Sequence, residues 1–272
     1  MMNTAAPAGT AAPTVNRILA QTRFETGTLL RNGEQLLVAL ILPAMALVGL
    51  ALSQSPSLGT GRRIDLAVPG VLALAVISTA FTGQAISTGF DRRYGVLRLL
   101  GVSPLGRGGL LIAKALAVVA IELLQGVVIG GLGLALGWHP QWTGLLAGVL
   151  LGLVGTWAFV ALALLLAGTL RAEGVLALAN LIWILLLGLG GVIVPRTEMS
   201  SGLSHVAALL PSGALGDGLR EAFIHGRLAG IPLLVLVVWG TVATMLASRT
   251  FRWIDLCRSW STPGCAKSCW ST

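Results

Sequence analysis

The residues best suited to chemistry in this sequence lie in one polar stretch, residues 86–114, between two long hydrophobic segments. The stretch reads ISTGFDRRYGVLRLLGVSPLGRGGLLIAK and holds five of the chain's 18 basic residues. Its spacing predicts a short amphipathic helix that ends at Gly101 and Ser103-Pro104. The apolar face would carry Phe90, Tyr94 and Leu97, and the basic face would carry Arg92, Arg93 and Arg98. The alternative is an ordinary cytoplasmic loop, because arginines there orient any membrane protein.

Glu122 is the one acidic residue near the middle of a predicted membrane-spanning helix. An ionisable side chain inside a bilayer is costly and is a functional-site hypothesis by default. Gln125 follows about one turn later on roughly the same face, so the two side chains could line a substrate route. The alternative is structural: Glu122 stays protonated or bonds a neighbouring helix, such as the one that carries Asn180. A proton-coupled carrier would normally contain more groups of this kind.

The sequence contains no motif for catalysis or for metal binding. It lacks the G-x4-G-K-[ST] loop for nucleotide phosphates, the G-x-S-x-G nucleophile turn and the H-E-x-x-H zinc motif. The cysteines follow the spacing C-x7-C-x3-C, which matches no standard zinc pattern. We therefore expect no catalytic residue, no metal and no cofactor in this chain. The residues considered and set aside are His139, His205, His225, Cys257, Cys265 and Cys269.

The composition indicates a membrane protein. Hydrophobic residues make up 55% of the 272 residues, charged residues make up 10%, and the mean hydropathy is +0.88. A soluble domain contains about 25% charged residues. The net charge of +8 does not indicate nucleic-acid binding, because no soluble domain is expected that could hold nucleic acid. Lys and Arg in cytoplasmic loops explain this charge instead.

The hydropathy pattern predicts an all-α, polytopic membrane protein. Residues 15–253 would form the transmembrane domain, between a disordered N-terminus (1–14) and an irregular cytoplasmic tail (254–272). An amphipathic interfacial helix is expected at 15–34, although this segment could also be a polar lead-in to the first span. Two short helices joined at Pro211 are expected in 196–227. The six predicted spans are 35–53, 66–87, 110–137, 143–170, 175–194 and 228–247.

Glycines recur at four-residue spacing in the third and fourth predicted spans. Small residues at this spacing allow close contact between helix backbones. We therefore expect these two spans to form a tight antiparallel hairpin. The glycines concerned are Gly126, Gly130, Gly133 and Gly137 in one span and Gly144, Gly148 and Gly152 in the other.

The distribution of basic residues predicts the orientation. With six spans and a cytoplasmic N-terminus, 13 Lys and Arg residues fall inside and 5 fall outside. This bias favours both termini in the cytoplasm of a cell whose plasma or inner membrane holds the protein. The stretch 86–114 would then be cytoplasmic, and 196–227 would be an external helical hairpin.

Three segments resemble ABC-2 type permeases, the membrane subunits of many bacterial exporters. DRRYGVLRLLGVSPLGRGGLLIAK (91–114) resembles the loop between their second and third spans, with its acidic-basic start, Gly, leucine run, Ser/Thr-Pro-Leu and Lys. LLRNGEQLLVALILPAMALV (29–48) and LLPSGALGDGLREAF (209–223) resemble segments of actinobacterial drug-export permeases. Asp91 replaces the usual Glu, and the usual acid beside the leucine run is absent. The matching positions are Asp91-Arg92, Gly95, Leu97-Leu99-Leu100, Ser103-Pro104-Leu105 and Lys114.

The resemblance implies that separate cytoplasmic ABC ATPase subunits bind ATP and Mg and drive this chain, which is itself not an enzyme. A second permease, identical or related, would complete the membrane unit in the bilayer. The substrate would be hydrophobic, such as a drug-like compound or a lipid. Two other hypotheses remain at this point: an ion-coupled carrier that uses Glu122, and a membrane anchor or assembly subunit that transports nothing. The residues expected to contact the ATPase are Phe90, Asp91, Arg92, Arg93, Tyr94, Gly95, Leu97 and Arg98.

Overall fold

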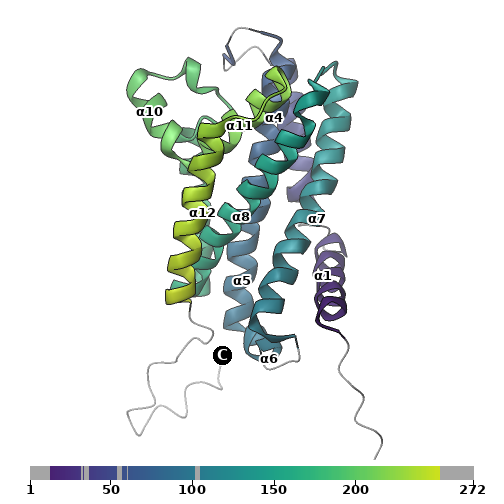
Figure 1. The fold of residues 1–272 in the computed structure, drawn as a ribbon, viewed down its shortest axis with the longest axis vertical. Coiled ribbons are helices and arrows are strands. Elements are labelled where there is room, and N and C mark those ends of the chain that lie inside the picture. Colours follow the sequence, from purple (N-terminus) through teal and green to yellow (C-terminus); the bar gives the residue numbers. More distant parts are fainter. Residues whose placement is uncertain are drawn as a thin grey trace, which may run out of the picture.

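Long helices run side by side along the length of the molecule (Figure 1). The structure is a computed structural model, and it describes residues 13–31, 33, 37–53, 57–59, 61–101 and 105–251. Every regular element within these ranges is a helix, which confirms the predicted all-α class. The predicted disordered N-terminus falls almost entirely outside the described residues, and the tail at 254–272 falls wholly outside them.

Five helices among the described residues are long and apolar enough to cross a membrane. They confirm the second to sixth predicted spans, with shifted ends. The second span is continuous from Arg63 to Arg93 and combines α4 (Arg63–Val76), the π-helical η2 (Ile77–Gly83) and α5 (Gln84–Arg93). The others are α7 (Gly106–Ala135), α8 (Leu145–Thr169) with η3 (Trp142–Gly144) before it, α9 (Ala172–Leu189) and α12 (Gly230–Thr250).

The first predicted span is described as the π-helical η1 (Leu37–Ile41) followed by α3 (Leu42–Leu52). Its apolar part, Ala39–Leu52, is shorter than the other five spans. Pro43 lies in the first turn of α3. In a regular α-helix the N–H of residue 43 would donate to the carbonyl of Ala39, and proline has no N–H. The helix is therefore irregular where the sequence places its proline.

The two ends of the bundle carry different short elements. At one end, here called the α11 end, lie η4 (Arg196–Glu198), α10 (Ser201–Leu209) and α11 (Pro211–His225). At the other, the α6 end, lie α6 (Val96–Gly101) and the last turn of α12, with α1 (Thr14–Arg31) beside the lower part of α7 (Figure 1). The predicted helical pair joined at Pro211 is confirmed. Its second helix buries the predicted face, Leu215, Leu219, Ala222 and Phe223.

Gly148 and Gly155 of α8 pack against α11, so the predicted glycine-mediated contact between the third and fourth spans is wrong. A Cβ atom on Gly148 would lie 2.7 Å from the Phe223 ring, and one on Gly155 would lie 2.9 Å from Leu215. At the same position on Gly126, in α7, no other part of the described chain lies within 4 Å. The reason is that α11 packs on the glycine-containing face of α8, which was predicted to contact α7.

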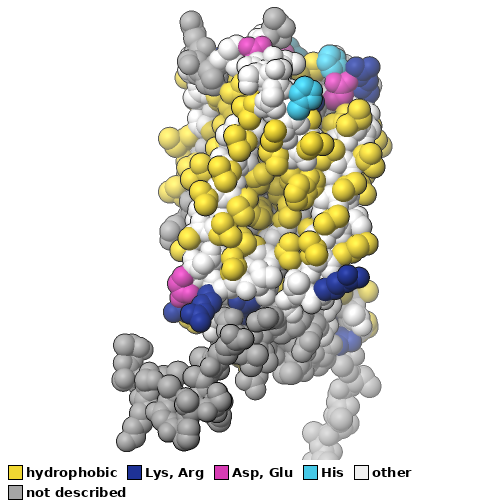
Figure 2. Space-filling model, turned by 90° about the vertical axis from the view of Figure 1, so that its left-hand side faces the viewer, with side chains coloured by type: hydrophobic (Ala, Val, Ile, Leu, Met, Phe, Trp, Pro, Cys, Tyr) yellow, Lys and Arg dark blue, Asp and Glu magenta, His cyan; other side chains and the backbone are white. Residues whose placement is uncertain are grey.

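The fifth span ends at Leu189 rather than at residue 194. Gly190 and Gly191 follow, and Gly191 has a φ of 65°, which only glycine adopts readily. On the outside of the bundle, hydrophobic side chains cover the middle, and charged side chains and histidines gather toward the two ends (Figure 2). This surface suits a bilayer around the middle of the helices.

Candidate functional site

The polar stretch 86–114 contains the end of α5, all of α6 and the start of α7. The single helix that was predicted to carry Phe90 to Arg98 and to end at Gly101 is therefore wrong, because these residues are divided between α5 and α6. Helix α5 continues the second span as far as Arg93, and a turn at Tyr94-Gly95 precedes α6. Gly95 has a φ of 73°, the left-handed conformation that commonly ends helices at glycine. The side chain of Arg98 lies outside the part of the chain that the structure describes.

The apolar and basic residues of this stretch do not separate onto two faces as expected. Tyr94 is 70% exposed and stacks on Phe90, with ring centroids 6.1 Å apart. Leu97 is fully buried. Arg92 was expected to turn away from the bundle but is only 4% exposed. Its guanidinium donates to the carbonyl oxygen of Leu170, because the C-terminal end of α8 offers an acceptor there.

Arg93 makes a second link from α5 to the turn between α8 and α9. It forms an ion pair with Glu173, in the first turn of α9. Both side chains are largely exposed, so the pair itself adds little stability. Arg92 and Arg93 therefore hold the end of the second span against the α8–α9 turn.

Lys114 joins three helices at the α6 end. Its ammonium nitrogen lies 2.7 Å from Asp91 Oδ2 of α5 and 3.2 Å from Glu25 Oε1 of α1, and its side chain is 3% exposed. Gln21 Nε2 donates to Glu25 Oε1 over 3.0 Å. We call these four residues the Lys114 cluster. A buried ammonium group needs such partners, because an unpaired charge is costly away from water.

The sequence marked Asp91 and Lys114 as motif positions but missed their pairing and missed Glu25 entirely. Glu25 is one of two acidic residues in 15–34, on a helix predicted to face the membrane interface. In the structure, α1 packs along the first half of α7, and Thr22 lies against the Ala113 carbonyl. The polar face of α1 therefore faces α7, while Val15, Leu19 and Phe24 are exposed.

Gln125 forms hydrogen bonds with two irregular helical segments in the middle of the bundle. Its Nε2 donates to the carbonyl oxygen of Ala39 in η1 (2.8 Å) and to the hydroxyl of Thr79 in η2 (2.9 Å). Ala39 is the residue whose carbonyl loses its α-helical donor at Pro43. Single π-helical turns are frequent at functional sites. Gln125 thus satisfies an acceptor that the first span cannot satisfy itself.

Glu122 and Gln125 form hydrogen bonds with different neighbours, and the hydrogen bond of Asn180 involves neither of them. Thr156 of α8 donates its hydroxyl to the Glu122 carboxyl. Asn180 is exposed on α9 and donates to the carbonyl of Leu176 in its own helix. Within the described chain, Glu122 Oε1 and Gln125 Oε1 are buried and accept no hydrogen bond. The structure thus brings α7 and α8 together at Glu122, and it leaves Asn180 on the outer surface.

A family model for the ABC-2 type transporter matches residues 16–224. The chain belongs to the ABC-2 type transporter family. The match runs from α1 to the end of α11 and includes every residue of the Lys114 cluster. It stops before α12, so the predicted resemblance up to residue 253 is tested only as far as 224. No curated protein matches the chain.

Family membership gives this chain a coarse role. An ABC-2 permease is a membrane component of an ABC transporter and not a catalytic domain, and the family normally works with ABC ATPase partners. The described residues contain no group of three or more His, Cys, Asp or Glu side chains that could hold a metal ion.

A buried charge cluster caps α9 of the permease at the α11 end. The Arg220 guanidinium donates to the carbonyl oxygens of Gly191 (2.9 Å), Val192 and Ile193 (3.2 Å), and it lies 3.5 Å from Asp217. Asp217 also pairs with Arg196. Burial lowers the pKa of Arg220 to about 10 and raises the pKa of Asp217, although the two arginines oppose the latter shift. Asp217 and Arg220 are not among the predicted site residues, although they stand three residues apart, as helical partners do.

Proposed function

We propose that this ABC-2 permease forms the membrane route of an ATP-driven exporter and is moved by separate ATPase subunits at its α6 end. The observation that carries the proposal is the Lys114 cluster. It ties α1, α5 and α7 together beside the turn at Tyr94-Gly95 and α6. Tyr94 and Leu99 expose 70% and 71% of their surface at this polar end of the bundle. Exposed apolar side chains of this kind suit a protein partner.

The distribution of basic residues supports a cytoplasmic α6 end, and with it two cytoplasmic termini in a cell membrane. Within the described residues, the α11 end carries Arg62, Arg63, Arg196, Arg220 and Arg227. The part of the bundle toward the α6 end carries Arg17, Arg23, Arg31, Arg92, Arg93, Lys114, Arg171 and Arg249.

The links around α5 give a path for force. A partner that binds α6 and the Tyr94-Gly95 turn would move the end of α5 when the partner changes conformation. The Lys114 cluster would pass that movement to α7 and α1, and Arg92 and Arg93 would pass it to α8 and α9. Rocking of two such bundles, from identical or related permeases, would open a route between them. ATP and Mg would be bound by the partner subunits.

The route would carry a hydrophobic substrate, such as a drug-like compound of the kind exported by actinobacterial permeases, or a lipid. Glu122 and Gln125 are candidates for its lining, since each has a buried oxygen that accepts no hydrogen bond from the described residues. Asn180 would line the route only where α9 faces the second permease, because it is exposed on the outer surface of this bundle.

The docking proposal is tested by two matched substitutions. Leu99→Ser and Leu209→Ser each replace a leucine that is 71% exposed, one at the α6 end and one at the α11 end. Purified with its native partners, the wild-type permease should retain an ATP-hydrolysing subunit. Leu99→Ser should reduce that retention at least fivefold, and Leu209→Ser should not. Equal retention by the two variants, or a complex without an ATPase, would overturn the proposal and favour the anchor hypothesis.

The free acceptor of Glu122 also favours one second candidate, an ion-coupled carrier. Glu122→Gln separates the two functions. The exporter proposal expects transport that depends on ATP and is indifferent to a pH gradient in both the wild type and the variant. A pH-gradient dependence that Glu122→Gln removes would instead establish the carrier.

A further inference from the structure

A pocket of about 560 Å³ opens at the α11 end, between α10, α11 and the start of α12. Its polar lining is two ion pairs, Arg196 with Asp217 and Arg227 with Glu221, so its charges balance. Its apolar lining includes Leu228 and Ile231, at the beginning of α12. The transport proposal assigns no role to this pocket. Its mixture of charge and apolar surface indicates an amphiphilic ligand.

The two ion pairs differ in how readily they can exchange partners. Asp217 is held by both Arg196 and Arg220 within the α9 cap. Arg227 is 72% exposed, and its Nε lies 2.6 Å from Glu221 Oε1. An exposed pair of this kind contributes little to stability. A ligand with one negative and one positive group can therefore replace it, with its anion on Arg227 and its cation on Glu221.

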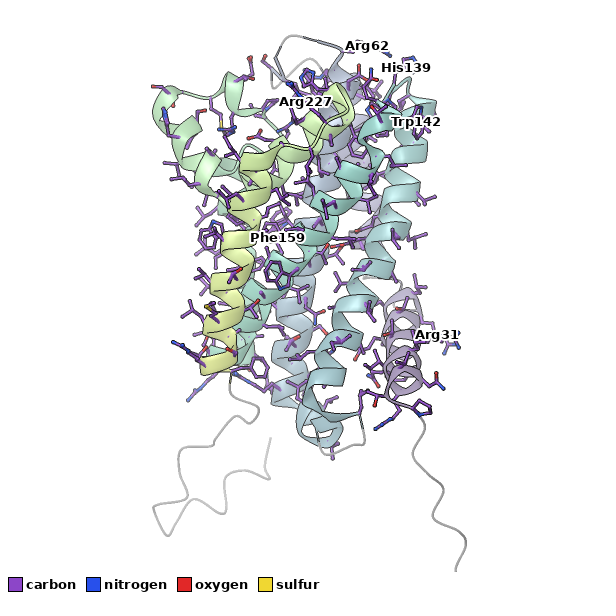
Figure 3. The ribbon with its side chains drawn as sticks, in the orientation of Figure 1. Arg31, Arg62, His139, Trp142, Phe159 and Arg227 are labelled. Carbon is purple, nitrogen blue, oxygen red and sulfur yellow. The ribbon has the colours of Figure 1, made fainter. Side chains whose placement is uncertain are left out.

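The first turn of α12 adds a second feature that favours an anion. Gly230 and Ile231 line the pocket, and no side chain in the described part of the protein caps this end of the helix. Free N–H groups and the helix dipole stabilise negative charge at such a position. Arg227 stands three residues before this turn (Figure 3). A phosphate between them would meet donors from both.

An apolar stripe leads from the pocket along the outer face of α12. Its members stand three or four residues apart, so they share one side of the helix. From first to last the stripe spans about 21 Å along the axis, at 1.5 Å for each residue. Figure 2, which views the left-hand side of Figure 1, where α12 lies, shows hydrophobic side chains over the middle of this face. The exposed members are Ile231, Leu234, Val238, Val242 and Met245.

We propose that the pocket binds the head group of a zwitterionic phospholipid, from the leaflet at the α11 end, with an acyl chain along the α12 stripe. The lipid phosphate binds Arg227 and the first turn of α12, and its ammonium group binds Glu221. Phosphatidylglycerol, whose head group carries no ammonium, supplies no cation for Glu221. This inference requires that the chain spans a membrane, and it does not depend on ATP-driven transport.

The test measures which lipid the permease retains. Purified permease is incorporated into vesicles of equal parts phosphatidylethanolamine and phosphatidylglycerol and re-extracted in mild detergent. The bound lipids are then counted by mass spectrometry. The wild type should retain at least five times more phosphatidylethanolamine than phosphatidylglycerol. Arg227→Gln and Glu221→Gln should each reduce that retention at least fivefold.

Arg62→Gln is the matched control, because Arg62 lies at the same end of the bundle and does not line the pocket (Figure 3). It should retain phosphatidylethanolamine as the wild type does. Equal retention of both lipids, unchanged retention in Arg227→Gln, or an equal loss in Arg62→Gln would overturn the proposal. Cross-linking of Ile231→Cys to a second permease copy, without labelling of this position by a photoreactive lipid, would also overturn the proposal, because protein would then cover this face.

Discussion

The ammonium group of Lys114 lies 2.7 Å from the carboxylate of Asp91, across the junction between the second and third spans. The two residues stand 23 positions apart, at the two ends of the loop region that contains α6. Their ion pair holds the two ends of this region together as one unit, and the ion pair of Lys114 with Glu25 links α1 to this unit. The two helices that flank α6 are therefore linked to each other and to α1.

The first prediction concerns the stability of this unit. Asp91→Asn removes one of the two carboxylates that Lys114 needs, and loss of one partner of a buried pair costs about 3–5 kcal/mol. Because Glu25 remains, we expect the lower end of that range. Asp65→Asn is the matched control: Asp65 and Asp91 are 24% and 26% exposed, but Asp65 lies 3.9 Å from the exposed Arg62. Thermal unfolding in detergent, followed by tryptophan fluorescence, should show a clearly larger loss for Asp91→Asn.

The second prediction separates two neighbouring arginines. Arg92 is buried and donates to the Leu170 carbonyl, whereas Arg93 pairs with Glu173 on the surface. Arg92→Gln should destabilise the permease by about 1.5–3 kcal/mol, as for loss of a hydrogen bond from a charged group. Arg93→Gln should cost less than about 1 kcal/mol. Equal unfolding midpoints for the two variants would mean that Arg92 does not hold the end of α8.

Local patterns in the sequence were sufficient for much of this fold. Apolar runs located the spans, and Pro211 located the break between α10 and α11. The spacing of Leu215, Leu219, Ala222 and Phe223 identified the buried face of α11. All of these signals involve residues within a few turns of one another. Gly95 was also a usable signal, because a glycine after a helical pattern commonly marks a helix end.

The site depended on contacts between distant parts of the chain, which one sequence does not reveal. Glu25 meets Lys114 across 89 positions, and Gln125 meets Ala39 across 86. Arg92 was placed on a solvated face because arginine usually lies there, and nothing local indicated that the Leu170 carbonyl would accept its guanidinium. Arg220 was missed for the same reason. Its acceptors are the carbonyl oxygens of Gly191, Val192 and Ile193, which can accept from it because α9 ends at Leu189.

The third prediction is a pH dependence at Asp217. Burial raises the pKa of this carboxyl above its ordinary value of 3.8. In the folded chain the group therefore keeps its proton to a higher pH than in the unfolded chain. Between the two pKa values the folded state binds more protons, so the free energy of unfolding falls as the pH rises from about 4.

Asp217→Asn removes this titration. The unfolding midpoint of the wild type should therefore fall relative to that of Asp217→Asn as the pH rises from about 4 upward. The comparison uses both proteins in the same detergent and salt, so that titration of other groups cancels. A wild type that gains stability relative to the variant over this range would show that Arg196 and Arg220 outweigh burial.

The fourth prediction tests why Gln125 is needed. Gln125→Leu leaves the Ala39 carbonyl without its donor, and an unsatisfied buried acceptor costs about 1–3 kcal/mol. The cause is Pro43, which cannot supply the N–H that would otherwise reach Ala39. In a Pro43→Ala background that N–H is restored, so Gln125→Leu should cost distinctly less than it does in the wild type. Unfolding of the wild type, the two single variants and the double variant gives the coupling between positions 43 and 125. Additive effects would mean that Gln125 stabilises the bundle through Thr79 alone.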